Sequence, residues 1–239
     1  MQWLTTHISQ EYGRELEDIR SKVLSMGGLV EQHLKMSIDA LATSKSDIAE
    51  EVATSDFKVN DLELEIDEEC TEILARRQPA ARDLRLVLAV IKIIRDLERI
   101  GDEASKVSRV TLRLIDLVSP KSYYVNVLNI GNHVRHMLHD ALDAFARMDH
   151  AMAIKIAHED ISVDREYDAA IRQLITYMME DPRSITSVLD VVWMVRALER
   201  IGDHVINICE SIIYLVKGKD VRHQPLDDLA KELQEAPST

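Results

Sequence analysis

Glycine, proline and aromatic residues are scarce in this chain. Its 239 residues include 7 glycines and 5 prolines, and only 4% are aromatic. Proteins built from many short strands need more of the residues that form turns, so this composition argues against a β-sandwich or β-barrel. The hydrophobic fraction of 46% is nevertheless enough to bury a core. We therefore predict an all-α protein.

The chain also has few cysteines, no long apolar run and no secretory signal pattern. Cys70 and Cys209 fall in the apolar phase of helical patterns, so we expect buried, reduced thiols. No stretch approaches the roughly 20 apolar residues of a membrane span. The first residues show neither the basic region nor the apolar run of a cleaved signal. We expect a cytoplasmic protein.

Positive charge is in deficit, and the common catalytic motifs are missing. Lys and Arg number 29 against 42 Asp and Glu, which gives a formal net charge of −13. Binding to a nucleic-acid backbone needs clustered cations, so we expect no nucleic-acid partner. The sequence contains no nucleophile constellation, glycine-rich phosphate loop or Glu-x-x-His pair. The sequence therefore offers no candidate catalytic residue, and we expect no organic cofactor.

What the chain does contain is a duplication. The hexapeptide Leu-Glu-Arg-Ile-Gly-Asp occurs at residues 97–102 and again at residues 198–203. Outside the hexapeptides, Gly27 aligns with Gly131 and Asp56 with Asp160. The chain is therefore interpreted as two copies of one unit of about 100 residues.

Hydrophobic periodicity divides each copy into three long helices. The first copy shows it over residues 16–41, 52–73 and 81–114, and the second over residues 127–148, 154–179 and 185–216. Ser44 and Asp47 have the spacing of a capping box before the second helix. Trp193 is expected in the core. We predict two tandem, elongated, antiparallel three-helix bundles, residues 1–119 and 120–218, followed by a polar tail, residues 219–239.

The duplicated hexapeptide places two carboxylates on one helix face in each copy, because Glu98 and Asp102 are four residues apart, as are Glu199 and Asp203. The preceding helix repeats the spacing, with Asp56 and Asn60 in the first copy and Asp160 and Asp164 in the second. Antiparallel neighbours could bring these rows together. Oxygen ligands suit cations such as Mg²⁺, Mn²⁺, Zn²⁺ or iron. We therefore predict a metal site in each copy, formed by these eight residues.

The alternative is a solvated acidic face whose charge is balanced by Arg95, Arg99 and Lys106. Gly101 and Gly202 favour a site, since glycine inside a helix costs about 1 kcal/mol relative to alanine and needs a reason. Close approach of a neighbouring helix is one such reason. The apolar period continues beyond both glycines, so both helices are expected to run through them.

These motifs together resemble the PhoU family. The resemblance rests on both hexapeptides, on Arg76-Arg77-Gln78-Pro79, on Asp83-Leu84-Arg85 and on residues 66–70 and 177–183, and it covers about His7 to Gly218. It implies two similar three-helix bundles, no known catalysis, a cytoplasmic homodimer and negative regulation of the phosphate regulon and of phosphate uptake.

The resemblance also implies partners and metals. It implies a link between the ATPase subunit of the phosphate ABC transporter and the sensor histidine kinase of the phosphate regulon, with membrane contact only through partners. Some family members bind iron or zinc through E/D-x-x-x-D motifs, which correspond here to the pairs named above. Asn60 departs from the motif and adds no charge, so the first copy should hold metal less tightly. A metal-storage or redox bundle and a plain scaffold are the alternatives.

Overall fold

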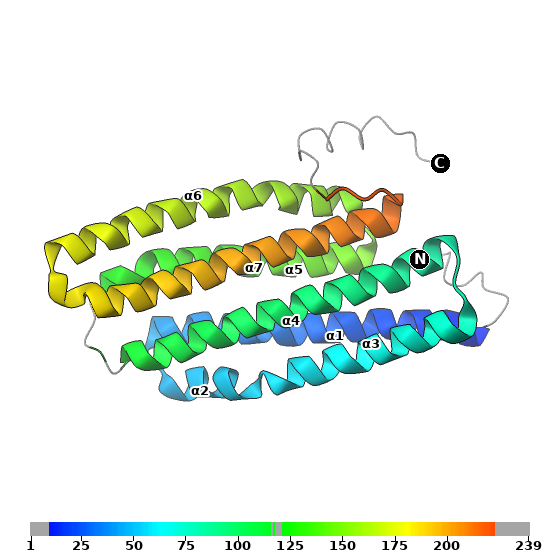
Figure 1. The fold of residues 1–239 in the computed structure, drawn as a ribbon, viewed down its shortest axis with the longest axis horizontal. Helices are drawn as coiled ribbons and strands as arrows, with labels where there is room; N and C mark the ends of the chain where they lie inside the picture. The colour runs from blue at the N-terminus through cyan, green and yellow to red at the C-terminus, as the bar shows by residue number, and fades with distance from the viewer. Residues whose placement is uncertain (1–9, 116, 118–120, 223–239) are drawn as a thin grey trace.

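The computed structural model describes residues 10–115, 117 and 121–222, and nearly all of them are helical (Figure 1). The helices are α1 (Gln10–Thr43), α2 (Ser46–Ser55), α3 (Phe57–Arg77), α4 (Ala81–Ile115), η2 (Lys121–Tyr124), α5 (Val125–Arg147), α6 (His150–Glu180), η3 (Pro182–Ser184) and α7 (Ile185–Lys217). No strand occurs among the described residues. The predicted all-α class is confirmed, and α4 and α7 run through Gly101 and Gly202 as expected.

The second predicted helix is not continuous, because α2 and α3 meet at Asp56. The hydroxyl of Thr54 donates to the Glu50 carbonyl at 2.8 Å, and the Ser55 hydroxyl lies 3.2 Å from His33 Nε2. Ser and Thr at such positions give the backbone alternatives to regular helical bonding. The second copy has His158 and Glu159 there, and α6 is unbroken.

The predicted capping box is wrong. Helix α2 begins at Ser46, and its N-cap is Lys45, which makes no side-chain capping bond. Ser44 instead occupies the turn before it, with a φ of 55° in the left-handed region. The helix therefore begins one residue later than the capping-box spacing indicates.

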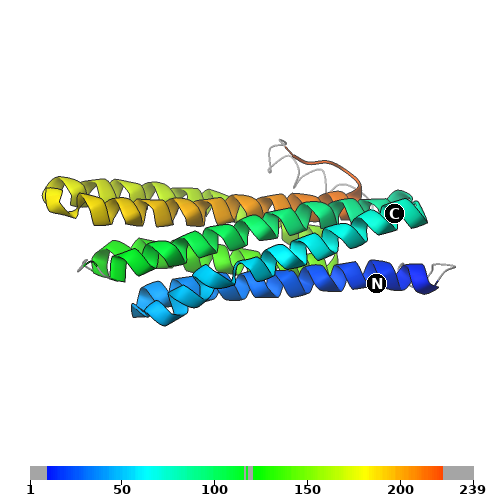
Figure 2. The same cartoon turned by 60° about the horizontal axis from the view of Figure 1, so that its bottom comes forward.

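The helices form two sets that pack against each other along their length (Figures 1 and 2). Helix α1, the α2–α3 pair and α4 form one set, and α5, α6 and α7 form the other. The sets meet where α4 lies antiparallel to α7 and where α1 lies against α5. The two elements that carry the hexapeptides are thus side by side at the centre of the molecule.

Glycines produce the close α1–α5 contact in a reciprocal way. A Cβ atom on Gly27 of α1 would lie 2.3 Å from Leu142 Cδ2 of α5, and one on Gly131 of α5 would lie 2.9 Å from Ile38 Cγ1 of α1. Gly27 aligns with Gly131, and Ile38 aligns with Leu142. The two copies therefore pack through the same residues in both directions, as an approximate two-fold relation requires.

Most core residues match the predicted apolar faces. Cys70 and Cys209 are fully buried free thiols, and burial raises the pKa of Cys70 to about 12. Trp193 is a correction, because it is 58% exposed on α7 rather than part of the core. None of the helices in the described residues has the length and apolar character needed to cross a bilayer.

Candidate functional site

The four predicted ligands of the first copy lie where α4 passes the junction of α2 and α3. We call Asp56, Asn60, Glu98 and Asp102 the first acidic cluster. A Cβ atom on Gly101 would lie 3.4 Å from Val59 Cγ1 and 3.7 Å from Asp56 Oδ1. The glycine therefore faces the carboxyl of Asp56 across the helix contact.

The second acidic cluster, Asp160, Asp164, Glu199 and Asp203, repeats this arrangement between α6 and α7. A Cβ atom on Gly202 would lie 3.4 Å from Asp160 Oδ1 and 3.6 Å from Val163 Cγ1. The close approach expected at both hexapeptide glycines is thus confirmed. These distances are ordinary van der Waals contacts, so an alanine would fit at either position, unlike at Gly27 and Gly131.

Both clusters contain carboxyl groups whose surroundings disfavour the ionised form. Burial, followed by the charges of Asp164, Asp203 and Glu199, raises the pKa of Asp160 to about 6. Burial first and neighbouring carboxylates second also raise the pKa of Glu199. Each of these carboxyls would therefore be more easily ionised if a cation were present.

The first cluster shows the same effect. Burial, the charge of Asp102 and a hydrogen bond with Asp102 raise the pKa of Asp56. Burial followed by the Asp102 charge raises the pKa of Glu98. Both helix rows therefore contribute to one electrostatic unit in this copy, as the sequence predicted.

The clusters differ in the ion pairs of their neighbouring arginines. Arg99 lies 3.4 Å from a Glu98 carboxylate oxygen and 4.0 Å from one of Asp102. Its counterpart in the second copy, Arg200, instead donates to Glu103 of α4 at 3.2 Å. The first cluster thus has three carboxylates with an arginine beside them, whereas the second has four carboxylates and its arginine is engaged elsewhere.

The donor atoms suit a hard or borderline cation. Asp56 Oδ1 and Asn60 Oδ1 are buried and accept no hydrogen bond from any described residue. Buried oxygens without donors are costly and are compensated when they bind a cation. As the side chains stand, however, no three His, Cys, Asp or Glu residues of the described chain form a finished metal centre. Metal binding would therefore require the carboxylates to reorient.

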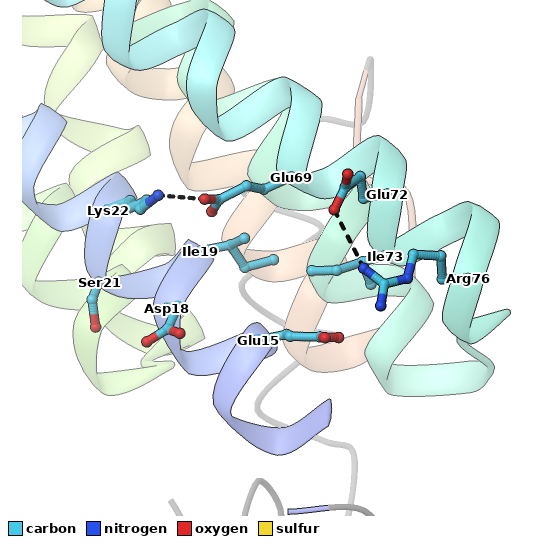
Figure 3. A pocket seen from close by; sticks show the side chains of 9 residues that line it. All are labelled: Glu15, Asp18, Ile19, Ser21, Lys22, Glu69, Glu72, Ile73 and Arg76. Carbon is cyan, nitrogen blue, oxygen red and sulfur yellow. Dashed lines mark hydrogen bonds and ion pairs between the residues drawn. The ribbon is translucent and has the colours of Figure 1, made fainter. Parts of the chain in front are cut away.

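A hollow of about 340 Å³ lies elsewhere, between α1 and α3, and the sequence did not indicate it (Figure 3). Its charged residues come in both signs, and one pair crosses it from α1 to α3. Lys22 of α1 bonds to Glu69 of α3, and Arg76 lies 3.6 Å from Glu72. Four acids and two cations line the hollow, and both cations are paired with acids of its wall. Among the described residues that line it, the hollow therefore offers no free cation for an anionic ligand.

Comparisons with known proteins point to one family. A family model described as the PhoU domain matches residues 23–111 and 127–212. The chain is 52% identical over 231 residues to a phosphate-specific transport system accessory protein PhoU homolog of Pseudomonas putida, covering 97% of this chain and 90% of that protein. It is 49% identical over 230 residues to the corresponding PhoU protein of Escherichia coli K12, covering 96% and 95%.

Two solved structures share the fold. The crystal structure of PhoU from Pseudomonas aeruginosa aligns with a TM-score of 0.85 at 52% identity, covering 87% of this chain and 100% of that one. The phosphate transport system regulatory protein PhoU from Streptococcus pneumoniae aligns with a TM-score of 0.81 at 29% identity, covering 88% and 99%. Both matches span both sets of helices.

Proposed function

Since the chain belongs to the PhoU family, we propose that it is a regulatory accessory protein of a phosphate transport system. The observation that carries this proposal is identity of about half of all residues over 96% of the chain with proteins named for that role. Similarity over the full length, with both hexapeptides present, supports a shared role better than a shared fold alone does.

In this role the chain restrains phosphate uptake and holds the phosphate regulon off when phosphate is abundant. It does so from the cytoplasm, as a homodimer that links the ATPase subunit of the phosphate ABC transporter to the sensor histidine kinase. Long helices packed in two sets offer extended faces for such contacts. Regulation, rather than catalysis, is the activity we assign.

Deletion of the gene tests the regulatory role. We expect phosphate-starvation genes to be expressed in high phosphate in the deletion strain, and a plasmid copy to restore repression. Co-purification of the tagged chain from phosphate-replete cells, with mass spectrometry, should recover the ATPase subunit and the kinase. Normal repression without the gene would reject the proposal.

A second activity is divalent metal binding at the two acidic clusters. In the first cluster it is supported by the buried oxygens of Asp56 and Asn60 that lack hydrogen-bond donors among the described residues. In the second it is supported by burial and by the mutual repulsion of the carboxyls, which together raise the pKa of Asp160. Asp160, Asp164, Glu199 and Asp203 would hold the ion in the second copy, and Asp56, Asn60, Glu98 and Asp102 in the first. A bound ion would supply positive charge to these clusters and tie α4 and α7 to their neighbours. Zn²⁺, Mn²⁺, Mg²⁺ and iron all suit carboxylate donors.

A metal-storage or redox bundle is the rival function. Di-iron bundles use inward-facing Glu-x-x-His pairs, whereas these clusters contain only carboxylates and one amide. Iron uptake and oxidation by the purified chain, measured by oxygen consumption, would favour the rival. Stoichiometric binding without turnover would favour the regulator.

A further inference from the structure

A groove of about 640 Å³ lies between the C-terminal half of α4 and the N-terminal half of α7. In Figure 1 this is the region where the green end of α4 runs beside the yellow end of α7. Its floor includes Val110 and Ala197, both nearly buried. We call it the cationic groove, and its walls carry Lys106, Arg109, Arg113, Trp193, Arg196 and Arg200.

Cations in this groove outnumber the acids that meet them. The one carboxylate among the lining residues, Glu103, is buried and is shared by Lys106 at 2.9 Å and Arg200 at 3.2 Å. Arg113 pairs with Asp190 at 2.6 Å. Five cations around one lining carboxylate, in a chain with a net charge of −13, mark a local reversal of the protein's charge.

Trp193 gives the groove an apolar contact as well as charge. It is 58% exposed on the same wall as Arg196 and Arg200. Tryptophan and arginine are the residues that most often dominate binding energy at protein interfaces. An exposed tryptophan beside guanidinium groups therefore favours a ligand that combines acidic groups with an apolar side chain.

The duplication provides an internal comparison, which we call the counterpart groove. It has a volume of about 280 Å³ and lies at the symmetry-related place between α4 and α7. In the alignment of the hexapeptides, Arg109 corresponds to Glu210, Arg113 to Tyr214 and Trp193 to Lys92. The counterpart groove is lined by two cations and three carboxylates. Of these two grooves between α4 and α7, only the cationic groove is strongly positive.

The counterpart groove also shows what such a groove accepts. The chain turns back after α7, and Asp220 and Arg222 line it, while Val221 between them is buried at 3% exposure. Lys92 on the opposite wall attracts Asp220 and contributes to lowering its pKa, after the larger effect of Arg222. A segment with an apolar residue next to an acid therefore forms part of the wall of that groove. All the lining residues of the cationic groove come from α4 and α7, so no other described segment covers it.

We propose that the cationic groove binds an extended acidic segment of a partner protein, with an apolar side chain placed against Trp193 and flanking Asp or Glu side chains paired with Arg109 and Arg196. Binding of such a segment goes beyond the regulatory role proposed above and does not depend on metal at the acidic clusters. The charge of the groove favours this occupant, and the attraction between Lys92 and Asp220 in the counterpart groove is a precedent for it.

A graft of counterpart residues tests the proposal, and thermal melts check that the variant remains folded, because the change at Arg113 removes its ion pair with Asp190. The variant Arg109→Glu, Arg113→Tyr, Trp193→Lys places in the cationic groove the side chains that the fold already accepts in its duplicate. The control, Arg95→Glu, changes the net charge equally at an exposed position outside both grooves. A random-peptide display library is selected on the full chain and counter-selected on the graft.

We expect the enriched peptides to be acidic with an apolar or aromatic residue. As labelled peptides they should bind the graft at least about tenfold more weakly than the wild type. They should bind the Arg95→Glu control with the same affinity as the wild type. In a Trp3→Phe background, peptide binding should shift the emission of Trp193 to the blue. Added salt should weaken binding.

Several outcomes would overturn the proposal. These are enrichment of neutral or basic peptides, equal binding to wild type and graft, or failure to enrich any peptide. Peptide binding only by a chain that ends at Arg222 would assign the groove to the chain's own residues 223–239. Conversion of a dimer to a monomer by the graft, measured by sedimentation, would assign it to a second copy of the chain.

Discussion

The two copies share their packing residues but differ in their charges. Gly27 and Gly131 make reciprocal contacts with Leu142 and Ile38, and both hexapeptide glycines face an aspartate. By contrast, the first copy has Asn60 where the second has Asp164, and their grooves differ in sign. Packing thus appears twice in the same form, whereas the sites that could meet ions or partners have diverged. Function should therefore be sought in the charges.

The largest expected effect concerns the shared packing. Gly131→Ala would place a Cβ atom 2.9 Å from Ile38 Cγ1, and overpacking should outweigh the helical gain and destabilise the chain by about 1 to 2 kcal/mol. Gly28→Ala is the matched control, because nothing lies within 4 Å of its Cβ position, and it should stabilise by about 1 kcal/mol. Urea unfolding measures both. Equal stabilisation by the two variants would contradict the close α1–α5 contact.

The next effect separates the acidic clusters. Glu199→Gln with Asp203→Asn should lower divalent metal affinity at the second cluster by at least about tenfold, about 1.4 kcal/mol. Without metal, this variant should be slightly more stable than wild type, because repulsion between carboxylates four residues apart is relieved. The matched double variant of the first cluster, Glu98→Gln with Asp102→Asn, should gain less stability without metal, since Arg99 loses both partners.

Titration with Zn²⁺ or Mn²⁺ and thermal melts with and without chelator measure these effects. Unchanged metal binding in the second-cluster variant, together with a lower melting temperature, would leave Glu199 and Asp203 as salt-bridge residues only.

A smaller effect is the pH dependence of the second cluster. The pKa of Asp160 is about 6 in the folded chain, above its ordinary value of 3.8, so the folded state favours the protonated form. Stability from this group is present below pH 3.8 and is lost as pH rises through about 6. After allowance for solvent screening, we expect a loss of about 1 kcal/mol.

Asp160→Asn should remove that pH dependence in chelator-treated protein. With saturating Mn²⁺ the sign should reverse, because protons compete with the ion and binding strengthens as pH rises. Melting curves from pH 4 to pH 8 test both statements. A wild-type pH profile identical to that of Asp160→Asn would show that the carboxyl is not perturbed.

Much of the fold follows from the sequence, because long amphipathic periods specify long helices. The junction at Asp56 did not, since Thr54 and Ser55 fit the helical period, and the contact of Ser55 with His33 of another helix cannot be read from the sequence. Trp193 was placed in the core because it is a large apolar residue within the helical period of residues 185–216. Its phase with Asp190, Arg196 and Arg200 was the signal that it faces outward.

The residues of the acidic clusters could be predicted from the sequence, but the ion pairs of the neighbouring arginines could not. Spacing alone placed Glu98 with Asp102 and Glu199 with Asp203 on one helix face. That Arg99 meets its cluster whereas Arg200 turns to Glu103 depends on the α4–α7 packing, which no local pattern specifies. The cationic groove was missed for the same reason, because its walls come from helices of different copies.

The central claim is that the second cluster holds a divalent cation more tightly than the first because of its extra carboxylate and its disengaged arginine. The direct test is calorimetric titration with Mn²⁺ of proteins in which only one cluster is intact. Each such protein is compared with a variant of its intact cluster, Asn60→Asp for the first cluster or Asp164→Asn for the second. We predict that Asn60→Asp raises the Mn²⁺ affinity of the first site and that Asp164→Asn lowers the affinity of the second. The difference in affinity between the two sites should then become smaller or change sign. Affinities that do not respond to either exchange would contradict the claim.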